Sequence, residues 1–69
     1  MKPQDFKAWR SKYRITQTHA ARMLHTTERT VQRWERGQVA LDGPARAFCE
    51  AFELLSQDAK SAMIEKYRT

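Results

Sequence analysis

The chain has little cysteine, little glycine and no long apolar run. Cys49 is its one cysteine in 69 residues, so no disulfide can form within the chain, and a reduced, cytoplasmic setting is expected. No apolar run approaches the roughly 20 residues that span a bilayer, and the opening MKPQDFKAW has no apolar block typical of a signal peptide. We therefore expect a soluble, unprocessed chain with no membrane partner.

The patterns on which catalysis and metal binding depend are also missing. There is no nucleophile with a matching base, no glycine-rich loop for a phosphate and no acidic pair at a useful spacing. His19, His25 and Cys49 do not complete a metal site, because no fourth ligand is evident. Cys49 as a redox switch is weakly supported, since it neighbours a core stripe and buried thiols are usually inert. We expect no enzyme, no cofactor, no metal and no small-molecule substrate.

Positive charge exceeds negative charge. Thirteen Lys and Arg against eight Asp and Glu give a formal net charge of +5. This balance favours a polyanionic partner through counterion release, but basic chains without a nucleic-acid role are also common. A chain of this length forms one domain with a small core, so association with a second chain would add stability.

Apolar residues recur at helical spacing along the chain, and no segment shows the alternation of a strand. The sequence therefore predicts an all-α fold in a single domain, residues 1–69. Phe6, Trp9 and Tyr13 share one face of the first helix and should lie in the core. Helices are expected at 4–13, 17–24 and 28–36, from Pro44 to Leu55, and from a cap at Ser56 or Asp58 through Tyr67.

The stretch TQTHAARMLHTTERTVQRWERG, residues 16–37, predicts two short helices joined by a tight turn. Thr16 and Thr27 are good N-caps for the two helices, and Gly37 is a good residue for the end of the second. His25 lies at the turn, where a residue with positive φ is commonly needed. Small residues such as Ala21 would allow the two helices to cross closely.

The second helix of this stretch has one apolar and one polar face. Val31 and Trp34 are one helical step apart and should face inward, together with Ala21 and Leu24 of the helix before. The polar face carries long hydrogen-bonding side chains that can reach into a DNA groove: Glu28, Arg29, Gln32 and Arg33. An ordinary solvated face is the alternative, but the preceding helix and turn favour a DNA reader.

The last third of the chain supplies more apolar surface. In the loop 38–43, Val39 and Leu41 are expected to pack onto the core. The fourth helix should bury a stripe formed by Phe48, Ala51, Phe52 and Leu55. The last helix has an apolar side that includes Ala59 and Ala62. That side could fold onto the first helix, but we favour a twofold dimer contact through Met63, Ile64 and Tyr67.

The segment ITQTHAARMLHTTERTVQRWERG resembles the helix-turn-helix of lambda-repressor-like (Cro and XRE-type) DNA-binding domains. The resemblance extends from Phe6 to about Leu55 and implies a five-helix domain of that family. It implies that Gln17 contacts the DNA backbone and that Arg10 and Glu35 form a structural salt bridge. It also places the following residues on the recognition helix: Thr27, Glu28, Arg29, Gln32 and Arg33. Arg14 and His25 stand at turns where many members carry glycine.

These features together predict a DNA-binding repressor. The third helix should enter the major groove, with the Thr16 hydroxyl and the Gln17 amide near phosphate. Arg29 and Arg33 are candidates for guanine. A homodimer should bind an inverted repeat at a promoter, where it represses, with autoregulation expected. Size and layout are similar to those of anti-CRISPR-associated repressors. They are also similar to those of antitoxins that bind a protein toxin and their own operator, and this is the alternative function.

Overall fold

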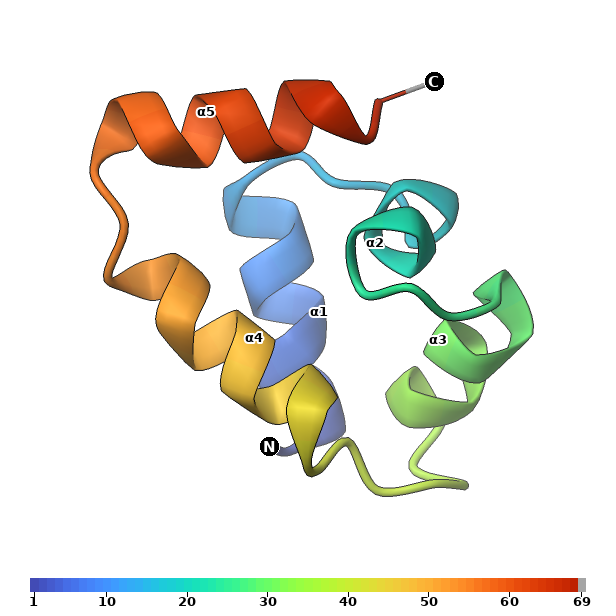
Figure 1. Cartoon of the computed structure of the whole chain (residues 1–69). Helices are drawn as coiled ribbons and strands as arrows, with labels where there is room; N and C mark the ends of the chain where they lie inside the picture. The colour runs from blue at the N-terminus through green and yellow to red at the C-terminus, as the bar shows by residue number, and fades with distance from the viewer. Residues whose placement is uncertain (69) are drawn as a thin grey trace.

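The computed structural model describes residues 1–68, which contain five α-helices and no strand (Figure 1). The prediction of an all-α fold with five helices is confirmed, with small shifts at the helix ends. None of these helices has the length and apolar character needed to cross a membrane. The helices are α1 (Pro3–Lys12), α2 (Gln17–Met23), α3 (Glu28–Glu35), α4 (Pro44–Glu53) and α5 (Gln57–Lys66).

The helix starts follow the capping residues in the sequence. The side-chain oxygens of Thr16, Thr27 and Ser56 each accept a hydrogen bond from the backbone N–H three residues later, at 3.1, 3.2 and 3.1 Å. Each bond satisfies one of the free N–H groups at a helix start. Pro3 and Pro44 begin α1 and α4, where the missing N–H has no cost. The predicted caps are therefore confirmed, with Ser56 as the cap of the last helix.

The first three helices end in the same way. The residue after each C-cap has a left-handed backbone, with φ of 55° at Arg14, 54° at His25 and 73° at Gly37. In each case two N–H groups bond back to carbonyls of the last helical turn, as Gln38 does to Arg33 at 3.0 Å. This is the Schellman arrangement, for which glycine is the usual residue. The positive φ predicted at His25 is confirmed.

Aromatic side chains of α1 form the centre of the core. Phe6 is fully buried, and its ring meets the edge of Trp34 at 5.7 Å, while Trp9 packs edge-on against Phe52 at 5.4 Å. Val31 of α3 is also fully buried. The predicted inward positions in α1 and α3 are confirmed, although Tyr13 is only half buried. Other core residues are Ile15, Ala20, Ala21, Met23, Leu41 and Cys49.

Three predicted core positions in the second half of the chain are wrong. Leu41 is 3 % exposed as expected, but Val39 is 45 % exposed. The loop that follows α3 first runs along the surface, where Val39 lies, and reaches the core only at Leu41. In α4, Ala51 is exposed and Leu55, just beyond the helix, is 36 % exposed. The buried side of α4 is instead centred on Cys49 and Phe52, so its phase is rotated from the predicted stripe.

Helix α5 crosses above α1, between the end of α4 and the end of α2 (Figure 1). Its apolar residues Met63, Ile64 and Tyr67 are half buried and pack against the chain's own core. The Nε2 atom of His19 in α2 donates a hydrogen bond to the carbonyl oxygen of Ile64 at 2.7 Å. The side expected to be free for a dimer contact is therefore covered in part by the same chain.

Candidate nucleic-acid interface

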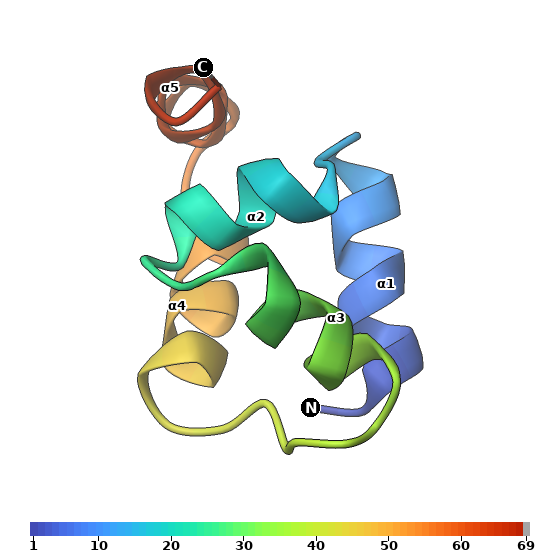
Figure 2. The same ribbon diagram turned by 90° about the vertical axis from the view of Figure 1, so that its right-hand side faces the viewer.

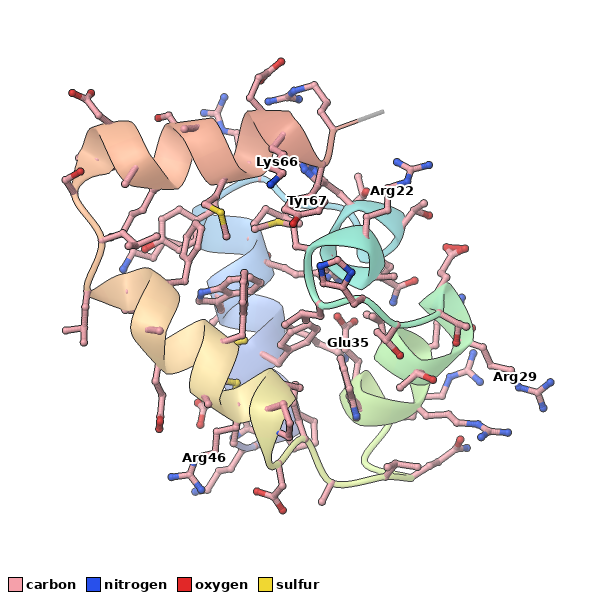
Figure 3. All side chains as sticks on the ribbon, in the orientation of Figure 1. Arg22, Arg29, Glu35, Arg46, Lys66 and Tyr67 are labelled. Carbon is pink, nitrogen blue, oxygen red and sulfur yellow. The ribbon has the colours of Figure 1, made fainter. Side chains whose placement is uncertain are left out.

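The polar face of α3 is open and lies on the outside of the molecule. Its residues line one groove, which contains the four polar side chains predicted from the sequence and two more just beyond the end of the helix. Arg29 extends away from the body of the chain (Figure 3). The groove residues are Glu28, Arg29, Gln32, Arg33, Arg36 and Gln38.

Arg36 and Gln38 were not among the residues predicted for this surface. Arg36 is the C-cap of α3, one turn beyond Arg33, and Gln38 follows the left-handed turn at Gly37. The turn folds Gln38 back toward Arg33, whose carbonyl it contacts at 3.0 Å. The helical spacing of Arg29, Arg33 and Arg36 was the signal in the sequence that could have identified Arg36.

The arginines of this groove keep their hydrogen-bond donors available. Within residues 1–68, no salt bridge involves Arg29, Arg33 or Arg36, and Glu28 is the groove's one acidic residue. A guanidinium group carries five donors in a fixed planar arrangement that fits phosphate or a guanine edge. The groove therefore presents a positive surface with donors free to bind an anionic or hydrogen-bonding partner.

The opposite face of α3 is fixed against the rest of the fold. Val31 is fully buried and Trp34 is 8 % exposed. Helix α2 lies across α3, and both helices face the viewer in Figure 2. Ala20 and Ala21 of α2 are buried, and their small side chains let the two helices approach closely. The exposed face of α3 is thus held in one orientation.

A buried ion pair holds the C-terminal end of α3. Arg10 donates to Glu35 through Nε to Oε2 at 2.6 Å and through Nη2 to Oε1 at 3.0 Å, so the salt bridge that the resemblance implied is present. The Glu35 side chain is 4 % exposed. Burial alone would raise the pKa of its carboxyl, but the hydrogen bonds from Arg10 and Gln17 outweigh it and hold this pKa below its ordinary value. Glu35 is therefore a charged acceptor at neutral pH.

Gln17 lies in this network. Its side-chain Nε2 donates to Oε1 of Glu35 at 3.1 Å. The resemblance implied that Gln17 contacts the DNA backbone, and the inward bond occupies one of its two amide N–H groups. Within residues 1–68 its second amide N–H makes no hydrogen bond, and neither does its backbone N–H at the first position of α2, where no carbonyl of that helix can pair with it.

The two capping threonines are exposed at the starts of α2 and α3. Thr16 and Thr27 each use a side-chain oxygen as a helix cap, and the Thr27 hydroxyl also lies 3.0 Å from that of Thr30. A hydroxyl that accepts a capping bond can still donate its own proton to a phosphate oxygen. Thr16 and Gln17, the predicted backbone contacts, therefore both lie at the start of α2, and Thr27, predicted on the recognition helix, lies at the start of α3.

The two histidines and the cysteine have other contacts. Among residues 1–68, no three His, Cys, Asp or Glu side chains gather closely enough to hold a metal ion. Cys49 is 1 % exposed, and its burial, with smaller contributions from Glu53 and Glu50, raises the pKa of its thiol to about 11. The thiol is therefore protonated at neutral pH and shielded from oxidants.

Comparison with protein-family models, with curated proteins and with solved structures gives no match to this chain. A functional interpretation therefore depends on the geometry and charge of α2 and α3. The relevant features are an outward groove whose three arginines form no salt bridge within residues 1–68, and an inward face fixed by Val31, Trp34 and Glu35.

Proposed function

We propose that this chain is a sequence-specific DNA-binding protein with a lambda-repressor-like helix-turn-helix, in which α3 is the recognition helix. The observation that carries the proposal is the exposed groove of α3, where Arg29, Arg33 and Arg36 have no acidic partner within residues 1–68. A helix with long polar side chains on one rigidly held face fits the width of the major groove of B-DNA.

Base contacts are assigned to the middle of the groove. Arg29 and Arg33 can each donate two hydrogen bonds to the O6 and N7 atoms of guanine. Glu28 can accept from the N4 amino group of cytosine, and Gln32 can pair with adenine. The preferred half-site should therefore contain G·C pairs. Each good two-bond contact gives about 1 to 3 kcal/mol of discrimination against the wrong base.

Backbone contacts are assigned to the edges of this surface. The Thr16 and Thr27 hydroxyls and the available N–H groups of Gln17 lie at the starts of α2 and α3 and can donate to phosphate oxygens. Arg36 and Gln38 flank the groove at its other end. Such contacts set the register of the protein on the duplex without reading its sequence.

The proposed active form is a homodimer on an inverted repeat. Two recognition helices related by a twofold axis read half-sites about 34 to 36 Å apart, or a multiple of that distance. The exposed parts of Met63, Ile64 and Tyr67 are the proposed contact, and Leu54, which is 88 % exposed, is a further apolar residue that a second copy could cover. Sedimentation equilibrium should give the mass of two chains. The mass of one chain at millimolar concentration would contradict the proposed dimer.

The proposed role is repression by blocking a promoter, including that of the protein's own gene. A footprint on the DNA directly upstream of that gene, at a stated salt concentration, tests the role. We expect a protected inverted repeat, with Arg33→Ala losing protection and Arg46→Ala, a substitution on α4, retaining it. Equal, weak binding to that DNA and to random DNA of the same length would contradict the proposal.

A further inference from the structure

A second group of basic side chains lies where the end of α5 meets α2. The group consists of Arg22 on the outer side of α2 and Lys66 and Arg68 at the end of α5, and we call it the basic corner. Figure 2 views the molecule from the side of α2 and α3, and the C-terminal end of α5 points toward the same side. Arg22 extends outward beyond α2, on the side to which Arg29 also extends (Figure 3).

The position of this corner is fixed by contacts between α2 and α5. Both histidines of the chain take part: His19 donates to the carbonyl of Ile64 at 2.7 Å, and the His25 ring meets the edge of Tyr67 with centroids 5.7 Å apart. Arg22 itself donates through Nη1 to the carbonyl oxygen of Arg68 at 3.5 Å. The C-terminal end of α5 is therefore held beside the helix that lies across α3.

Charge is distributed unevenly between this corner and the α4 side of the molecule. Glu65 is the one acidic residue in the last turn of α5, and it pairs with Arg68 at 2.9 Å. Around α4, basic and acidic side chains alternate and form ion pairs: Arg46 with Glu50 and Asp42, and Lys12 and Lys60 with Glu53. A surface that only meets water normally mixes both signs, as the α4 side does.

Arg22 is the residue of the corner best placed to bind an anion. It is exposed, it makes no ion pair within residues 1–68, and its one hydrogen bond to a neutral carbonyl leaves most of its five donors free. The Lys66 ammonium lies 5.6 Å from the centre of the Tyr67 ring, a contact that keeps its charge. The corner therefore retains positive charge, and Arg22 carries it to the side of the molecule to which Arg29 extends (Figure 3).

We propose that the basic corner binds the phosphate backbone of the same duplex that α3 reads, so that the DNA contact extends beyond the recognition helix to the end of α5. This inference rests on the proposed function. The corner contributes affinity and salt dependence but no base discrimination, because phosphates carry no direct sequence information.

The test is the salt dependence of DNA binding by the full chain, with the preferred duplex and a random duplex of equal length. Each lost phosphate contact should reduce the slope of log K against log salt by about 0.9. In the proposed dimer, Arg22→Gln removes one contact from each of two protomers, so it should lower the slope by about twice this amount on both duplexes, and Arg22→Lys should restore it. Arg46→Gln is the matched control, since Arg46 is an exposed arginine on the other side of the molecule (Figure 3) and should leave the slope unchanged.

Uncharged methylphosphonate linkages outside the bases that α3 reads separate the corner from the recognition helix. With the phosphates that the corner contacts neutralised in this way, wild type should lose the affinity that Arg22→Gln has already lost, and the two proteins should bind alike. An unchanged slope for Arg22→Gln, while Arg33→Ala still loses base discrimination, would overturn the corner and leave the proposed function standing. A wild-type chain with no sequence preference on any duplex would overturn both.

Discussion

Arg10 and Glu35 are joined by two hydrogen bonds of 2.6 and 3.0 Å, which tie the last turn of α1 to the last residue of α3. Arg10 also donates to the carbonyl oxygen of Ile15 at 3.0 Å, in the turn before α2. With Gln17 as the third donor to Glu35, one carboxylate connects α1, α2 and α3. This connection fixes the orientation of the groove on α3.

Removal of one partner of this pair should destabilise the fold strongly. Because the Glu35 side chain is 4 % exposed and that of Arg10 is 20 % exposed, Arg10→Met leaves a buried charge without its partner. We expect a loss of about 3 kcal/mol in the free energy of unfolding, measured in urea. The control is Arg46→Ala on an exposed ion pair, for which the loss should be below about 0.5 kcal/mol. Equal effects of the two substitutions would contradict this account.

The pair should also make stability depend on pH in the acid range. The carboxyl of Glu35 has a lower pKa in the folded chain than in the unfolded chain. The contribution of this carboxylate to stability is therefore complete above its pKa in the unfolded chain, near 4.5. It is lost as the pH falls through the lower pKa of the folded chain. The free energy of unfolding of wild type should fall more steeply below pH 5 than that of Glu35→Gln, in which Glu53 is retained. Parallel curves would exclude Glu35 as the cause.

Glycine should be the more stable residue at both left-handed turns, so adding it at position 14 and removing it at position 37 should have opposite effects on stability. Arg14 adopts a φ of 55°, which costs a residue with a side chain about 1 to 2 kcal/mol, partly offset by the greater chain entropy that glycine loses on folding. Arg14→Gly should therefore stabilise the chain by about 0.5 kcal/mol. Gly37→Ala should cost about 1 kcal/mol through the backbone alone, since an added Cβ would meet only Pro3 at an ordinary 3.6 Å. Thermal unfolding of both variants measures the difference, and a stabilising Gly37→Ala would contradict it.

Helix positions and caps could be predicted because they depend on local chemistry. Thr16 and Thr27 cap helices with their own oxygens, and Gly37 supplies a left-handed backbone, so each signal is contained within a few residues. The spacing of Val31 and Trp34 likewise gives the inward face of α3 directly.

The exposed positions of Val39, Ala51 and Leu55 could not be predicted in the same way. Apolar residues cover a broad arc of α4, and only the packing of other helices decides which part of that arc is buried. The burial of His19 depends on a carbonyl 45 residues away in the chain. The inward hydrogen bond of Gln17 depends on Glu35, and local sequence patterns do not show that these two residues lie close together. Long-range contacts of this kind have no signal in the spacing of residues.

The most direct test of the central claim is a selection of preferred sites from random duplex DNA, followed by titration of each single-base variant of the selected site at fixed salt. We expect a G·C-containing inverted repeat. Arg29→Ala and Arg33→Ala should each lose about 1 to 3 kcal/mol of discrimination at one base pair per half-site and leave the other positions unchanged. If selection yields no enriched sequence, or if both variants discriminate every position as wild type does, α3 is not a recognition helix.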